Sequence, residues 1–135
     1  MTKPMPELAG ERAIMVAGVA MSADNCPVRD VMANVSSKWN SLILLMLGEG
    51  PKRFSVLRRE IPDISQRMLT QALRDLQRDG YIHRTVFPTQ PPSVEYKLTD
   101  IGQSFLNVMK QIVDWSVDHH DAIRVARANF DGKSG

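Results

Sequence analysis

The stretch ISQRMLTQALRDLQRDGYI, residues 64 to 82, decides the fold of this 135-residue chain. Its apolar side chains recur at helical spacing; they are Met68, Leu69, Ala72, Leu73 and Leu76. This spacing predicts an amphipathic helix with one side on a core. Ser65 is a good N-cap for the helix, and Gly80 can end it in a left-handed conformation. The opposite side is polar and basic, and that polarity calls for an explanation.

The residues before this stretch predict three further helices. Pro27 suits the first position of a helix that runs to about Val35. Residues 39 to 47, WNSLILLML, are apolar nearly all round and predict a buried helix. Residues 54 to 61 predict a short helix, because Pro62 disfavours helix at the residue before it. Two short helices joined by a turn of three or four residues form a helix-turn-helix.

After Gly80 the hydrophobic period changes from helical to two. The segments YIHRTVF and SVEYKL flank the turn PTQPPS, which predicts a β-hairpin over residues 81 to 98. Thr99 then caps a long helix, and residues 122 to 130 predict a last helix after it. The fold class is therefore α+β and mainly helical: a winged helix-turn-helix with a two-stranded β-hairpin as its wing.

The long helix carries two apolar stripes. The first consists of Ile101, Phe105, Val108, Met109 and Ile112. The second consists of Leu106, Val113 and Val117. A single domain buries one helix face easily, so the second stripe predicts a dimer contact.

Length and composition fit one domain with terminal extensions. We expect an N-terminal extension over residues 1 to 25, in which residues 14 to 21 could form a short helix against a partner. The main domain spans 26 to 124, and a helix end and tail span 125 to 135. The apolar run from Ala13 to Met21 is too short for a membrane span. The chain has one cysteine, which fits a reducing compartment. We therefore expect a cytoplasmic protein.

Positive charge is concentrated around the opening stretch. Residues 51 to 84 hold eight Lys or Arg residues against four acids, a net charge of +4, whereas the whole chain carries +2. In a winged helix-turn-helix, the N-terminal part of the second motif helix enters the major groove of DNA. The polar side of that helix therefore predicts contacts to base edges and phosphates, in preference to a merely solvated helix face. The candidate DNA-binding residues on it are Ser65, Gln66, Arg67, Thr70, Gln71 and Arg74.

Several motifs together resemble the HxlR-type family of bacterial transcriptional regulators, relatives of the MarR group. They are Cys26-Pro27, Lys38-Trp39, GPKRFSVLRREIPDISQRMLTQALRDLQRDG, PPSVEYKLTDIG and Asp114-Trp115. The resemblance covers about residues 26 to 124. It implies a homodimeric regulator, most often a repressor, that binds a palindromic operator in double-stranded DNA. The resemblance also implies that terminal dimerisation helices build the dimer. Many relatives have a basic residue where Ser93 stands, so a wing-tip arginine is not expected in this chain.

Four more basic residues are candidates for phosphate contacts in the DNA, with plain solvated charge as the alternative. They are Lys52, Arg53, Arg84 and Lys97.

Cys26 has two interpretations. Several redox-sensing members of the family use a cysteine at this N-terminal position, so the resemblance makes Cys26 a candidate sensor of oxidants or electrophiles. The alternative is a structural Cys-Pro that packs and starts a helix, with control by a small-molecule ligand.

Other functions fit the sequence less well. A protein-interaction module would need an acidic or apolar face on the helix over residues 65 to 79. An enzyme would need a positioned base beside its nucleophile, and the chain offers no such signature. His119 and His120 are neighbours and do not share a helix face, so no metal site is expected. No cofactor is expected either.

Overall fold

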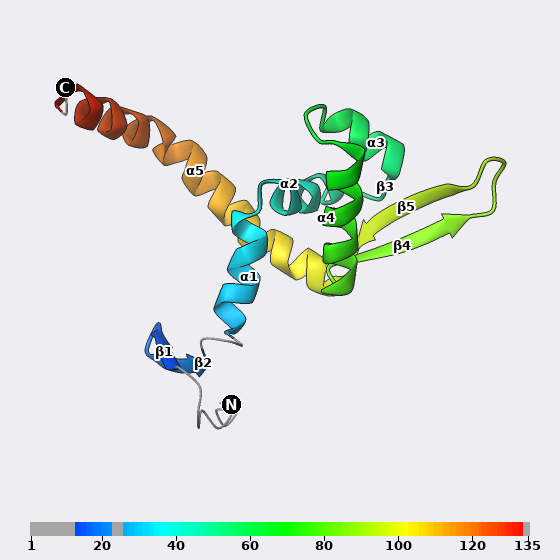
Figure 1. Ribbon diagram of the computed structural model, residues 1–135, viewed down its shortest axis with the longest axis horizontal. Coiled ribbons are helices and arrows are strands. Elements are labelled where there is room, and N and C mark those ends of the chain that lie inside the picture. Colours follow the sequence, from blue (N-terminus) through cyan, green and yellow to red (C-terminus); the bar gives the residue numbers. More distant parts are fainter. Residues whose placement is uncertain (1–12, 23–25, 134–135) are drawn as a thin grey trace. The chain divides into compact units, whose positions relative to one another are not determined.

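The computed structural model describes residues 13–22 and 26–133, which belong to two units, Met1–Lys38 and Trp39–Gly135. The first unit holds the strands β1 (Ala13–Val16) and β2 (Val19–Ser22) and the helix α1 (Pro27–Ser36). The second holds the winged helix-turn-helix and a long helix (Figure 1). None of the described helices is long and apolar enough to cross a membrane.

Residues 13 to 22 form a β-hairpin, so the prediction of a short helix here is wrong. β1 and β2 are antiparallel, with Val16 opposite Val19. The two-residue turn between them places Ala17 at φ 51° and Gly18 at φ 81°. Such turns match the twist of the flanking strands but need positive φ at both central residues. Ala-Gly is a weak signal for this turn, because alanine rarely adopts positive φ.

α1 begins as predicted, with Pro27 at its first position and Cys26 as its N-cap residue. The Cys26 side chain makes no capping hydrogen bond. The backbone carbonyl of Cys26 accepts a hydrogen bond from Asp30 N–H, the first bond of the helix.

The second unit is built on one core. The helices α2 (Lys38–Leu47), α3 (Phe54–Glu60) and α4 (Gln66–Arg78), with Ile61 directly after α3, contribute most of the buried leucines and isoleucines of this core. α2 is the apolar helix that the sequence predicts, and α3 and α4 are the helix-turn-helix. Burial of a leucine or isoleucine side chain contributes about 1.5–3 kcal/mol, so this cluster holds the three helices together.

Both ends of α4 are as predicted. The Ser65 hydroxyl accepts a hydrogen bond of 3.1 Å from Met68 N–H. At the other end Gly80 has φ +83°, and its N–H donates to the Gln77 carbonyl while Tyr81 N–H donates to the Leu76 carbonyl. These two bonds form a Schellman motif, which satisfies carbonyls that the helix end leaves open.

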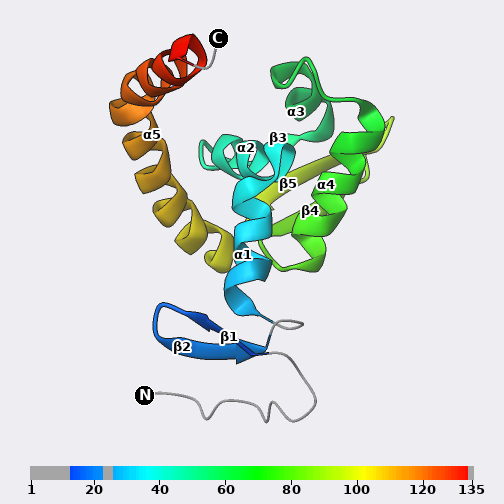
Figure 2. The ribbon, with the colours of Figure 1, turned by 60° about the vertical axis from the view of Figure 1, so that its left-hand side comes forward.

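The wing consists of β4 (Ile82–Phe87) and β5 (Ser93–Leu98), as predicted. A two-residue strand that the sequence did not indicate, β3 (Lys52–Arg53), adds to the other edge of β5. In Figures 1 and 2, α4 lies beside the root of the wing. Register places Arg84 opposite Tyr96, and Tyr96 opposite Lys52, so these three side chains share one face of the sheet.

Thr99 joins α4, the wing and the last helix. Its N–H donates to the Tyr81 carbonyl at 3.0 Å, and its hydroxyl donates to the Gly80 carbonyl at 2.6 Å. The same hydroxyl accepts from Gly102 N–H at 3.1 Å and caps α5 (Asp100–Lys133). α5 is one helix of 34 residues, so residues 122 to 130 are helical as predicted, but they continue α5 and do not form a separate last helix.

The rotation of α5 differs from the prediction. Leu106 is only 1% exposed and packs over Gly48, so the assignment of Leu106 to a surface stripe is wrong. Ile101, Val108 and Ile112, expected on the core side, are exposed. The reason is steric, because the first turn of α5 approaches Tyr81 through Gly102, and this contact fixes which face turns inward.

We predict that Gly102→Ala lowers the free energy of unfolding by about 1–3 kcal/mol, because a Cβ at this position would collide with the Tyr81 carbonyl oxygen. Gly132→Ala in the same helix is the matched control, since nothing lies near a Cβ there. The control should be neutral or stabilising by up to about 1 kcal/mol. Thermal unfolding followed by circular dichroism checks both variants, and equal melting temperatures would contradict the steric account.

Candidate nucleic-acid interface

The six residues predicted on the polar side of α4 are all exposed. They lie opposite the buried side chains Leu69, Leu73 and Leu76. The Ser65 cap keeps the first turn of the helix ordered, so the side chains of its N-terminal half project from a fixed backbone.

Two of the exposed residues are glutamines with partners inside the chain. Gln66 Oε1 accepts from Arg58 Nη1 at 3.1 Å. Gln71 Nε2 donates to Asp75 Oδ1 at 2.9 Å. These bonds orient the two amides, because a guanidinium only donates and a carboxylate only accepts. Each glutamine keeps one part of its amide for an outside partner.

Arg67, Thr70 and Arg74 have no hydrogen-bond or ion-pair partner among residues 13–22 and 26–133. An exposed guanidinium without a partner offers five N–H donors to a planar acceptor. Arginine pairs bidentately with guanine in the major groove, and it also binds phosphate. This helix face therefore presents cationic donors to its surroundings.

The four basic residues predicted to contact phosphates do not form one group. Lys52 Nζ lies 3.1 Å from Glu60 Oε1 and 3.8 Å from Glu49 Oε1, and its side chain is only 14% exposed. Lys97 pairs with His83 and alternates with Tyr96 along β5, so it lies on the opposite face of the sheet from Arg84. Arg53 and Arg84 are exposed and line a common cavity.

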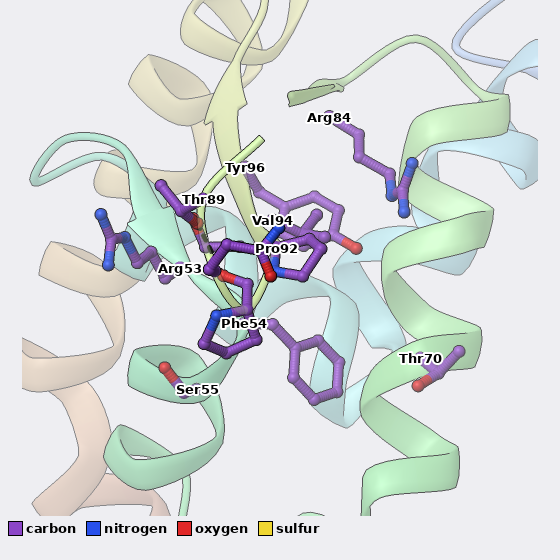
Figure 3. Close-up of a pocket in the computed structure, with 12 residues that line it drawn as sticks. Arg53, Phe54, Ser55, Thr70, Arg84, Thr89, Pro92, Val94 and Tyr96 are labelled. Carbon is purple, nitrogen blue, oxygen red and sulfur yellow. Dashed lines mark hydrogen bonds between the residues drawn. The ribbon is translucent and has the colours of Figure 1, made fainter. Parts of the chain in front are cut away.

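This cavity has a volume of about 710 Å³ and lies between α3, α4 and the wing (Figure 3). Phe54, Val94 and Tyr96 give it apolar walls, and Arg53 and Arg84 bring positive charge. A smaller recess of about 330 Å³ lies against α4. It is lined by Thr70, Arg74, Gln77, Arg84 and Tyr96.

Tyr96 lines both spaces, and it is not among the site residues predicted from the sequence. The only available signal was its place in the alternating pattern of β5. That pattern puts Tyr96 on a face but does not show that Arg84 stands opposite it. The register of the hairpin decides that pairing.

Cys26 is 2% exposed, and its Sγ lies 3.6 Å from Met21 Sδ in the same unit. His119 stacks on Trp115 with ring centroids 4.3 Å apart, and His119 Nδ1 lies 2.9 Å from the Trp115 carbonyl oxygen. Within the part of the chain that the structure describes, no three His, Cys, Asp or Glu residues gather as metal ligands.

Comparison with known proteins places this arrangement in a family. The model of the HxlR-like helix-turn-helix family matches residues 34–124. The HTH-type transcriptional regulator YtfH of Escherichia coli is 44% identical over 93 residues, which cover 69% of this chain and 74% of YtfH.

Two solved structures are also similar. The putative transcriptional regulator ytfH from Salmonella typhimurium has a TM-score of 0.71 and 38% identity, over 78% of this chain and 94% of that one. The redox regulator HypR in its reduced form has a TM-score of 0.70 and 36% identity, over 73% of this chain and 98% of HypR. The relatives are regulators and not enzymes. This chain belongs to the HxlR-like helix-turn-helix family of transcriptional regulators, with a winged-helix fold.

Proposed function

We propose that the protein binds a specific sequence of double-stranded DNA by placing α4 in the major groove. The observation that supports this is the set of donors, unpaired among the described residues, on the exposed face of α4, formed by the side chains of Arg67, Thr70 and Arg74. The helix is 13 residues long and capped, and the wing stands beside it to follow the DNA backbone. A protein-interaction module is disfavoured, because this face is neither acidic nor apolar.

The two groups of contacts have different tasks in this proposal. Arg67 and Arg74 read base edges, where each bidentate pair with guanine contributes about 1–3 kcal/mol of discrimination. Arg53 and Arg84 hold phosphates, which fix the register of the protein on the duplex but carry no sequence information. Lys52 contributes less, because Glu60 already neutralises it.

The functional unit we propose is a homodimer on a palindromic operator. α5 exposes Val108, Ile112, Val113, Trp115 and Val117, more apolar surface than one chain covers. Val113 and Val117 stay in this proposed interface, and Leu106 leaves it because it is buried inside the chain. A two-fold dimer would present two copies of α4 to half-sites about 34–36 Å apart.

Such a dimer represses transcription by occupying promoter DNA in the cytoplasm. For its control we propose oxidation of Cys26, supported by the likeness to HypR, which is named a redox regulator. The chain has one cysteine, so a disulfide would join Cys26 to Cys26 of the partner subunit or to a small thiol. Control by a small-molecule ligand, with Cys26 structural, is the second candidate, favoured by the burial of the thiol.

We predict that Arg67→Ala with Arg74→Ala keeps the fold and abolishes the preference for promoter DNA over unrelated DNA. The reason is the loss of the base-reading guanidinium groups. Fluorescence anisotropy with labelled duplexes at fixed salt measures both affinities. Arg124→Ala with Arg127→Ala, which removes the same charge from α5, is the matched control. Retained sequence preference in the α4 variant would defeat the assignment.

We predict that Ile112→Glu with Val117→Glu converts dimers into monomers, because two carboxylates would have to be buried in an apolar contact. Light scattering gives the mass. Gln103→Glu with Asn107→Glu adds equal charge at exposed polar positions of α5 and should leave the dimer intact. An unaltered dimer in the first variant would show that α5 is not the interface.

We predict that peroxide or diamide releases the protein from promoter DNA and that Cys26→Ser resists this release. A gel shift of both proteins, before and after treatment and after added reductant, measures the effect. Should the wild-type protein stay bound after oxidation, Cys26 is structural and control belongs to a ligand. Loss of binding in both proteins would assign the damage to the methionines or another oxidisable group.

A further inference from the structure

Tyr96 combines a buried ring with a hydroxyl group that lacks a partner. The residue is only 7% exposed. Its hydroxyl makes no hydrogen bond to any residue that the structure describes. No fully buried side-chain oxygen or nitrogen of the described residues is unsatisfied, so this hydroxyl must open onto the spaces that Tyr96 lines. Figure 3 shows it pointing toward α4.

A phenol in this position needs an explanation. The ring is buried, whereas the hydroxyl reaches the two open spaces and bonds to no described residue of the chain. A phenylalanine would bury the same ring, so the ring alone does not account for a tyrosine here. The hydroxyl is therefore suited to a partner outside the chain.

The neighbouring groups indicate what that partner is. Arg84 stands opposite Tyr96 in the sheet, and Thr70 and Arg74 approach from α4. The two guanidinium groups only donate hydrogen bonds, and the hydroxyls of Thr70 and Tyr96 can donate as well. No acidic residue lines either space. Such a set of donors fits an anion with several oxygen atoms, as a phosphate group has.

We propose that Tyr96, Thr70, Arg74 and Arg84 bind one phosphodiester group of the DNA backbone at the root of the wing, with the Tyr96 hydroxyl as a neutral donor. This inference rests on the proposed function, because it needs DNA on α4. The residues of the site come from α4 and the wing, the two elements that we propose to contact DNA, so its placement favours a backbone phosphate over a free one. The site adds Tyr96 and Thr70 to the phosphate contacts, and it means that the Arg74 guanidinium shares its five N–H donors between a base edge and this phosphate.

The first test compares Tyr96→Phe with Tyr81→Phe. These are the only two tyrosines, and the Tyr81 ring packs on Phe105 and lines neither space. Tyr96→Phe should weaken binding to promoter DNA and to unrelated DNA by the same factor, about tenfold, as expected for a hydrogen bond to a charged group. The dependence of affinity on salt should not change, because no charge is removed. Tyr81→Phe should bind like the wild-type protein.

The second test locates the phosphate. Duplexes in which a single phosphate is replaced by a neutral methylphosphonate are titrated with the wild-type protein and with Tyr96→Phe. Replacement of the phosphate at one position should clearly weaken DNA binding by the wild-type protein. The same replacement should hardly change binding by Tyr96→Phe, because the variant has already lost that contact. DNA binding by Arg84→Gln should also depend less on the phosphate at that position. The slope of log affinity against log salt should become smaller in magnitude by about one, because one positive charge is removed.

The outcomes separate the two proposals. Wild-type protein that binds no duplex from its promoter contradicts the DNA-binding function itself. Wild-type binding with unchanged affinity in Tyr96→Phe overturns the phosphate site alone. Loss of sequence preference in Tyr96→Phe also overturns it, because it would assign the hydroxyl to a base. The last measurement is calorimetry with inorganic phosphate. Phosphate that binds the wild-type protein but not Tyr96→Phe, while both proteins bind DNA equally well, would assign the site to a free phosphate. That result would overturn the backbone contact.

Discussion

The contact between Thr99 and the end of α4 holds the functional parts together. Thr99 binds the carbonyls of Gly80 and Tyr81 through its hydroxyl and its N–H, and the same hydroxyl caps α5. Because Gly80 ends α4 and Tyr81 leads into β4, one residue ties α4, the wing and α5 to each other. Gly102 completes this junction, since only a residue without a Cβ fits against the Tyr81 carbonyl. A shift of α5 would therefore be transmitted to both parts of the proposed DNA interface.

The same junction explains the two surfaces of the domain. The bond from Thr99 N–H to the Tyr81 carbonyl continues the register at which β5 runs beside β4, and this register brings Arg84 opposite Tyr96. The junction also fixes the rotation of α5, so that Leu106 and Met109 are buried while Ile112 and Trp115 are exposed. The proposed DNA contact and the proposed dimer contact thus depend on one small group of hydrogen bonds and on one close approach.

The positive charge that the proposed interface presents depends on which basic side chains are ion-paired within the chain, and not only on how many there are. Lys52 belongs to the basic segment, but its ion pair with Glu60 neutralises it. Arg58 gives one N–H to the neutral Gln66 amide and keeps its charge. Arg67 and Arg74 have no such partners among the described residues, so their full charge is available to DNA. A count of basic residues from the sequence overstates the interface, because it cannot distinguish a paired side chain from an open one.

The sequence by itself determined the helices of the motif, the wing and the exposed basic face of α4. These features depend on caps and turns such as Ser65, Gly80 and Thr99, whose preferences act over a few residues and can be read locally. Only the tertiary structure decided which stripe of α5 is buried, which lysine is neutralised and which tyrosine meets Arg84. Each of these depends on contacts between residues far apart in the chain, whose geometry is set by packing and strand register and not by local sequence.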